Sequence, residues 1–130
     1  MERVTYFFYG TLMDAAILSR VSGTAVTAAR LRPAVLDGYR RVRVAGENYP
    51  ALAASPGGRV EGCLFRNAVP EVQRRIAAYE EDTYEPRWEW VKGIGGIKTH
   101  ALVFTAGPKM RLTDEEWSFA DWCRTHRRPF

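Results

Sequence analysis

The sequence predicts one α+β domain over residues 1–130, built on a mixed, largely antiparallel sheet that can close on itself. Short runs of β-branched and aromatic residues, separated by glycine and proline turns, are typical of strands. Stretches with helical spacing of apolar residues lie between some of these runs. Because strands and helices do not alternate as they do in a parallel βαβ sheet, an antiparallel or mixed sheet is expected.

The length and composition agree with one globular domain. A chain of 130 residues can bury a core without a metal or disulfides, and its 46% hydrophobic and 12% aromatic content argues against disorder. The two cysteines, Cys63 and Cys123, lack the spacing of a zinc site or a redox motif and are expected to be buried thiols. The amino terminus has no apolar stretch that fits a signal peptide or a membrane span, so the prediction is a cytoplasmic protein with no membrane partner.

The formal net charge of +4 permits an anionic ligand without requiring one. Basic residues gather in two groups, Arg30, Arg32, Arg40, Arg41 and Arg43, and Arg124, Arg127 and Arg128. Neither group is interleaved with aromatic residues or accompanied by a known reading helix, so no nucleic-acid partner is expected. We interpret both groups as solvated surface.

Two helices have clear local signals. Residues 4–9 are predicted to form a strand, after which Asp14 is suited to cap a short helix that Gly23 ends. Pro70 suits the first turn of a second helix, and residues 70–80 are rich in good helix formers. The sequence therefore predicts one helix soon after the first strand and one in the middle of the chain.

Turn signals divide the remaining first half into short strands. Residues 25–36 and 39–44 are expected to form two strands joined by a hairpin turn at Asp37-Gly38. A further turn at Pro56-Gly57-Gly58 precedes a predicted strand over residues 60–65.

The last third of the chain is predicted to hold two strands and a final helix. The strands cover residues 88–92 and 99–105. Thr113 and Glu116 match a capping box, which would start the helix there. Four residues would then lie along one helix face: Phe119, Trp122, Cys123 and His126.

The tetrapeptide Tyr9-Gly10-Thr11-Leu12 closes the first predicted strand. Glycine at this point tolerates backbone angles, and a close approach of other groups, that a Cβ would prevent. The amides of Gly10, Thr11 and Leu12 are therefore able to point together at a small anionic or carbonyl group. Many glycines after strands only turn the chain, so a purely structural interpretation stands beside this one.

Glu80 is the candidate for proton transfer. A helical wheel puts it at the edge of an apolar face and puts Glu81 on the opposite side. That apolar face consists of Val72, Ile76 and Tyr79. A carboxylate at an apolar boundary is desolvated, which raises its pKa toward the range of a general acid-base at neutral pH. The alternative is a structural ion pair with Arg75 or Arg87.

Four segments, in this order, carry a resemblance to a known family. They are Tyr9-Gly10-Thr11-Leu12, Tyr49-Pro50-Ala51-Leu52, Val60-Glu61-Gly62, and Tyr79-Glu80 followed by Tyr84 and Arg87. Together they resemble the gamma-glutamylcyclotransferase-like superfamily, in the branch of the gamma-glutamylamine cyclotransferases and plant avirulence-induced proteins. The resemblance covers residues 4 to about 105 and leaves the carboxyl-terminal helix outside. It implies a small mixed β-barrel flanked by helices.

The resemblance also implies a reaction, in which the α-amine of a γ-glutamyl group attacks its own side-chain amide and releases 5-oxoproline and a free amine. Glu80 is then the general acid-base, and the amides of residues 10–12 hold negative charge. Tyr9 and Tyr84 would position the small-molecule γ-glutamyl substrate, and no metal or organic cofactor is required. The substrate's acceptor part and the oligomeric state are left open. The alternative is a non-catalytic small-molecule-binding or regulatory domain of the same fold.

Overall fold

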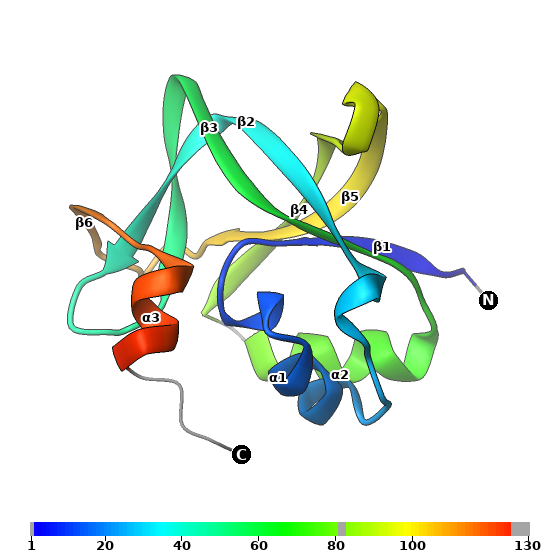
Figure 1. The fold of residues 1–130 in the computed structure, drawn as a ribbon. Helices are drawn as coiled ribbons and strands as arrows, with labels where there is room; N and C mark the ends of the chain where they lie inside the picture. The colour runs from blue at the N-terminus through cyan, green and yellow to red at the C-terminus, as the bar shows by residue number, and fades with distance from the viewer. Residues whose placement is uncertain (1, 81–82, 126–130) are drawn as a thin grey trace.

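Over the residues that the structure describes, the chain folds into a closed barrel of five strands with a sixth strand attached to its outside (Figure 1). The computed structural model describes residues 2–80 and 83–125. Around the barrel the strands follow the order β3, β1, β5, β4 and β2, and β2 pairs with β3 to close it. In the described ranges the strands are β1 (Val4–Phe8), β2 (Leu31–Val44), β3 (Pro50–Ala68), β4 (Tyr84–Lys92), β5 (Lys98–Ala106) and β6 (Leu112–Glu116).

Helices flank this barrel. The α-helices of the described ranges are α1 (Ala15–Ser22), α2 (Pro70–Glu80) and α3 (Phe119–Thr125), and short 3-10 turns cover Thr11–Met13, Ala28–Arg30 and Ile94–Gly96. In Figure 1, α1 and α2 pack together beneath the barrel, and α3 lies near β6. None of these helices is long and apolar enough to cross a membrane.

The predicted fold class is confirmed. β1 and β5 run parallel, whereas the other paired strands are antiparallel. The sheet is therefore mixed and largely antiparallel, it closes into a barrel, and helices flank it, as the sequence and the resemblance indicated.

The two helices with clear local signals form where they were predicted. The carboxylate of Asp14 accepts hydrogen bonds from the amides of Ala16 at 2.9 Å and Ile17 at 3.2 Å, which satisfies the free amides at the start of α1. Gly23, with φ of 75°, ends α1 in the left-handed conformation that glycine favours. α2 begins at Pro70 and ends at Glu80.

The predicted hairpin at Asp37-Gly38 is wrong. β2 runs from Leu31 to Val44, and Gly38, with φ of 90°, lies at an irregularity in its pairing with β3. β3 likewise continues through Pro56-Gly57-Gly58, so the second predicted turn is also wrong. The two strands are joined through residues 45–49 instead. A bulge bends a long strand without ending it, which lets β2 follow the curve of the barrel.

The predicted capping box is wrong as well, because residues 112–116 form β6. The hydroxyl of Thr113 donates to the carbonyl of Arg43 at 2.8 Å, and Glu116 pairs with Val42. Both residues are used in joining β6 to β2. A capping motif is a local signal, and the hydrogen-bonding edge that β2 offers to a strand outweighs it here.

α3 starts after Ser118, whose hydroxyl accepts a hydrogen bond from the amide of Asp121 at 3.2 Å. Phe119 and Trp122 stack on one another with ring centroids 6.1 Å apart. His126, which was predicted for the same helix face, lies outside the described residues, as do the basic residues 127 and 128.

The core has two layers because the side chains of β1 alternate between the two faces of the barrel wall. Phe7 and the adjoining Tyr9 pack inside the barrel, whereas Tyr6 and Phe8 pack outside it. The outer layer is covered by apolar side chains of α1 and α2, of which Leu18 and Ile76 are completely buried. Burying a side chain of this size stabilises a fold by about 1.5–3 kcal/mol.

The two cysteines differ in burial. Cys63 belongs to the outer core layer, and burial raises the pKa of its thiol to about 12, so it is an unreactive group. Cys123 on α3 is only half-buried. The expectation of a buried thiol therefore holds for Cys63 alone.

Candidate functional site

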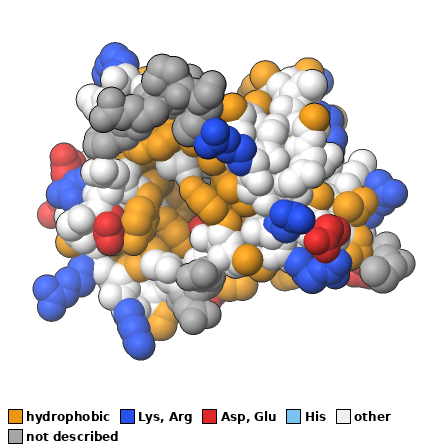
Figure 2. Space-filling view, turned by 90° about the horizontal axis from the view of Figure 1, so that it is seen from below, with side chains coloured by type: hydrophobic (Ala, Val, Ile, Leu, Met, Phe, Trp, Pro, Cys, Tyr) orange, Lys and Arg blue, Asp and Glu red, His pale blue; other side chains and the backbone are white. Residues whose placement is uncertain are grey.

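A cavity of about 310 Å³ lies between the end of β1, the end of α2, the start of β4, and α3. Seen from below, the molecule is hollowed where hydrophobic side chains gather (Figure 2). The cavity is lined by all the residues that the sequence predicted for the site: Tyr9, Gly10, Thr11, Leu12, Glu80 and Tyr84. Its walls are completed by Phe7, Phe8, Asn48, Tyr49, Pro50, Tyr79, Thr83, Phe104 and Trp122. The volume fits a small ligand.

The turn after β1 is closed by hydrogen bonds from the amides of Met13 and Asp14, which come after its first residues. The amide of Met13 donates to the carbonyl of Gly10 at 3.0 Å, and that of Asp14 donates to the carbonyl of Thr11 at 3.1 Å. The amides of Gly10, Thr11 and Leu12 precede these bonds, as the first amides of any helical turn do. They are therefore suited to a ligand that carries an oxygen acceptor.

Two reasons predicted glycine at position 10: its backbone angles and a close approach. The φ of −122° and ψ of −141° there belong to neither the helical nor the extended region, although φ is not positive. A Cβ built on Gly10 would lie 3.2 Å from Cγ of Pro50, which is tighter than most real contacts. The second reason, close approach, holds at this position.

Glu80 ends α2 and brings a carboxylate to the cavity. Its side chain is half-buried, and this burial raises its pKa from 4.5 to about 7. The alternative ion pair with Arg75 or Arg87 does not form among the described residues, where Arg75 instead pairs with Glu71 at 3.5 Å. A carboxyl group with a pKa near neutrality can both accept and release a proton there. Glu81 lies outside the described residues.

The hydroxyl groups of two tyrosines beside Glu80 donate hydrogen bonds to backbone carbonyls. The hydroxyl of Tyr9 donates to the carbonyl of Phe104 at 2.5 Å, and that of Tyr84 donates to the carbonyl of Pro50 at 2.7 Å. Burial raises the pKa of both hydroxyls, and the charge of Glu80 adds to the effect. Both tyrosines therefore form walls, or accept hydrogen bonds, without donating to a ligand in this arrangement.

Tyr79 departs from its place on the helical wheel. The wheel grouped it with the buried Val72 and Ile76, but its side chain is 48% exposed. Its hydroxyl shares a hydrogen bond of 3.1 Å with Oγ1 of Thr11. Both residues line the cavity, so this bond connects the end of α2 to the turn after β1.

Arg41 lies behind that turn and outside the cavity. Its Nη1 donates to the carbonyls of Tyr9 at 3.0 Å and Glu61 at 2.9 Å, and its Nε donates to the carbonyl of Trp117 at 3.1 Å. The side chain is half-buried. The interpretation of its basic group as solvated surface is therefore wrong for Arg41.

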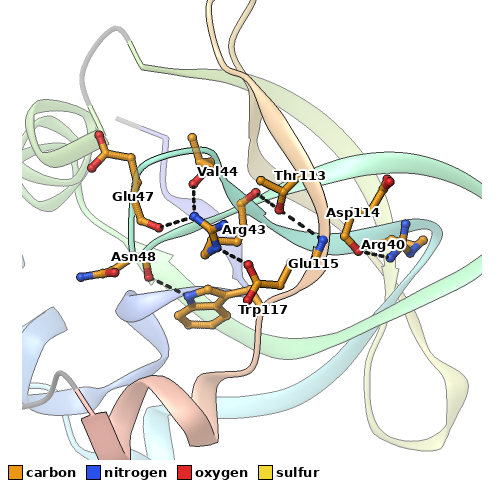
Figure 3. A network of polar contacts seen from close by, with 9 residues as sticks. All are labelled: Arg40, Arg43, Val44, Glu47, Asn48, Thr113, Asp114, Glu115 and Trp117. Carbon is orange, nitrogen blue, oxygen red and sulfur yellow. Dashed lines mark hydrogen bonds and ion pairs between the residues drawn. The ribbon is translucent and has the colours of Figure 1, made fainter.

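A polar network holds the connection between β2 and β3, where Asn48 lines the cavity (Figure 3). The indole nitrogen of Trp117 donates to the carbonyl of Asn48 at 2.7 Å. Arg43 donates to the carbonyl of Glu47 at 3.4 Å and pairs with the carboxylate of Glu115 at 2.5 Å. β6 and the residue after it thereby hold the connection between β2 and β3, which leads into the cavity wall at Asn48.

Sequence reasoning missed several residues that form or support the site. Tyr49 and Pro50 had a signal, because they belong to a segment that carried the resemblance, but they were given no role. Trp122 was predicted to lie on a helix face but was given no part in the site, and Arg41 and Trp117 had no local signal. Their places depend on contacts between segments far apart in the chain, such as the 76 residues that separate Arg41 from Trp117.

The comparisons with known proteins agree with this barrel fold. The family model described as "Gamma-glutamyl cyclotransferase, AIG2-like" matches residues 6–124. The chain therefore belongs to this family of cyclotransferase-like proteins. The match includes β6 and α3, so the expectation that the carboxyl-terminal helix lies outside the resemblance is wrong.

Individual relatives are similar at low identity. The chain is 26% identical to AIG2-like protein A of Arabidopsis thaliana and 28% identical to Protein AIG2 C of the same plant, in each case over 95% of this chain and 74% of the relative. A solution structure from Arabidopsis thaliana matches with a TM-score of 0.75 and 23% identity, covering 97% of this chain and 76% of that one. A structure titled gamma-glutamyl cyclotransferase matches with a TM-score of 0.72 and 13% identity, covering 85% and 70%. These structural likenesses establish the shared fold.

Proposed function

We propose that the protein is a γ-glutamyl cyclotransferase in which Glu80 moves the proton. The main support is the desolvated carboxyl group of Glu80, which faces the same cavity as the turn at residues 10–12. Membership of the cyclotransferase family supports the reaction class. The substrate is a small-molecule γ-glutamyl amide, and the products are 5-oxoproline and an amine.

The reaction exchanges one carbon–nitrogen bond for another without water. The α-amino nitrogen attacks the carbon of the side-chain amide, and a bond forms between them. The bond from that carbon to the leaving nitrogen then breaks. Of the two protons that the ammonium nitrogen loses in becoming the lactam nitrogen, one is released to water, where the amine product takes up another, so atoms and charges balance. The other passes from the attacking nitrogen to the leaving nitrogen.

Glu80 is our choice for the group that carries this proton. An ammonium group has no free electron pair and must lose a proton before it attacks, whereas the departing nitrogen must gain one. With a pKa of about 7, Glu80 is present as base and as acid near neutrality, so one residue serves both steps. The same desolvation lowers the pKa of the substrate's ammonium group, which brings the two pKa values closer together.

The amides of Gly10, Thr11 and Leu12 donate hydrogen bonds to negatively charged oxygens of the substrate. The γ-glutamyl group brings an α-carboxylate, and the attack turns the amide oxygen into an oxyanion. Fixed backbone amides stabilise either group, and loss of one such donor to an oxyanion lowers kcat by about 100- to 1000-fold in other enzymes.

The test is to incubate the purified protein with γ-glutamyl amides and to measure 5-oxoproline by mass. A substrate with a free α-amine should release 5-oxoproline, and its N-acetylated counterpart should not, because acetylation removes the nucleophile. Glu80→Gln should lose turnover, whereas Glu85→Gln, at an exposed position of β4, should retain it. If the acetylated compound is cleaved as fast as the free amine, the enzyme uses water and Glu80 is the base of an amidase. Ligand binding without release would instead identify a non-catalytic binding domain.

A further inference from the structure

We propose that Arg41 is a positioning residue that fixes and strengthens the amide of Gly10 as a donor to the substrate's negative charge. The inference rests on the proposed function, because it concerns the amides of that same site. Arg41 belongs to β2 and does not line the cavity. It would act through the peptide unit that joins Tyr9 to Gly10.

The direction of the Gly10 amide follows from the planar trans peptide. Nη1 of Arg41 donates to the carbonyl oxygen of Tyr9 at 3.0 Å. In a trans peptide unit the C=O and N–H bonds point in opposite directions. The N–H of Gly10 is therefore turned away from the guanidinium group. Since Gly10 lines the cavity and Arg41 lies behind it, this direction leads toward the cavity.

The guanidinium group also strengthens that amide as a donor. Hydrogen bonds in series polarise one another, by about 10–30% for each bond. Arg41 keeps its charge even though burial lowers its pKa, because an arginine is not deprotonated in proteins. A positive charge thus stands behind the Gly10 turn without entering the cavity. Inside the cavity the same charge would pair with Glu80 and lower the pKa that proton transfer requires.

The contacts of Arg41 need the shape of a guanidinium group. One side chain reaches the carbonyls of Tyr9, Glu61 and Trp117, which come from three separate segments of the chain. The amide of Trp117 returns a hydrogen bond to the carbonyl of Arg41 at 3.2 Å. A lysine carries its charge on a single nitrogen and cannot reproduce this fork. Lysine should therefore replace Arg41 poorly although the charge is kept.

The experiment compares Arg41→Lys with Arg40→Lys. Arg40 is the neighbour on the same strand, and it donates to the carbonyl of Asp114 at 3.1 Å, away from the Gly10 turn. For each variant, kcat and KM for 5-oxoproline formation are measured on protein whose folded fraction is known. Arg41→Lys should lower kcat/KM by about tenfold or more, since it weakens an amide donor of this kind, and Arg40→Lys should stay within about twofold of wild type.

The split between kcat and KM separates positioning from a structural role. A higher KM with unchanged kcat would assign the Gly10 amide to the α-carboxylate, and a lower kcat with unchanged KM would assign it to the oxyanion. Either result supports the proposal. Unchanged kcat and KM in folded Arg41→Lys, with only the stability lowered, would overturn it.

Binding of 5-oxoproline tests the inference apart from turnover. If the wild-type protein releases no 5-oxoproline, the proposed function fails, but the affinity for 5-oxoproline can still be measured by calorimetry. Weaker binding by Arg41→Lys than by Arg40→Lys supports the positioning role, whereas equal binding, or none by either, overturns it. In case Arg41→Lys does not fold, NMR of the wild-type protein provides a second readout. The Gly10 amide proton should move downfield when 5-oxoproline binds, and an unmoved resonance would contradict the proposal.

Discussion

Replacing Glu80 by glutamine tests how the desolvated charge of Glu80 affects stability, independently of its role in turnover. Burial raises the pKa of Glu80 from 4.5 to about 7, so the folded protein binds this proton more tightly than the unfolded chain does. The stability linked to this group is therefore complete below about pH 4.5 and is lost as the pH rises through about 7. Glutamine has a similar shape and no charge at any pH. We therefore expect Glu80→Gln to be more stable than wild type at pH 8 and similar to it near pH 4.

The size of the effect follows from the displacement of the pKa. One pKa unit corresponds to about 1.4 kcal/mol, so a rise from 4.5 to about 7 corresponds to about 3.5 kcal/mol as an upper bound. Because the side chain is only half-buried, solvent screening reduces this value, and a gain of about 1–3 kcal/mol in the free energy of unfolding is expected at pH 8.

Urea denaturation of both proteins between pH 4.5 and pH 8 measures this difference. Glu71→Gln is the control, because Glu71 belongs to the same helix and is exposed. A hydrogen bond from Arg74 lowers the pKa of Glu71, so its stabilisation is present above its ordinary pKa and is lost on acidification. Glu71→Gln should therefore gain no stability at pH 8. A difference between Glu80→Gln and wild type that stays constant across this pH range would refute the desolvation of Glu80.

Two glycine substitutions test the close approaches around the site. Gly10→Val should weaken ligand binding by about tenfold or more, because a branched side chain would crowd Pro50 and enter the cavity, and undiminished affinity in a calorimetric titration would contradict this. Gly62→Ala should lower the free energy of unfolding by about 1–3 kcal/mol, because a Cβ there would lie 2.3 Å from the carbonyl oxygen of Phe8 on the neighbouring strand. A variant as stable as wild type in urea would show that β1 and β3 can separate without cost.

The parts of the fold that the sequence predicted well are those with local causes. Asp14 and Gly23 begin and end α1 through contacts within a few residues, and Pro70 starts α2 in the same way. The errors arose where distant strands decide the outcome. Asp37-Gly38 is a good hairpin signal in isolation, but pairing of β2 with β3 on both sides of it leaves only a bulge. Thr113 matches a helix cap, but β2 offers it a strand partner.

The same distinction applies to the candidate site. The wheel position of Glu80 predicted a carboxylate at an apolar edge, and the structure makes it half-buried. The helical wheel wrongly predicted that Tyr79 is buried, because a wheel assumes that the apolar face of a helix packs on the core along its whole length. Arg41 looked like surface charge in sequence, since nothing near it reveals the three distant carbonyls that it contacts. Residues that support a site through such distant contacts can be recognised only from the folded structure.

The most direct test of Glu80 as the base is the pH dependence of kcat/KM for a γ-glutamyl amide with a free α-amine. In the proposed reaction the desolvated carboxylate of Glu80 accepts the proton of the attacking amine. As the pH rises, kcat/KM should therefore climb through a limb near pH 7, the pKa to which burial raises Glu80, because the protonated acid cannot act as base. The substrate's α-carboxyl titrates well below this range, and its ammonium group titrates above it. A limb near the roughly 4.3 of a free glutamate, or no limb between pH 5 and 8, would contradict the role of Glu80 as a desolvated base.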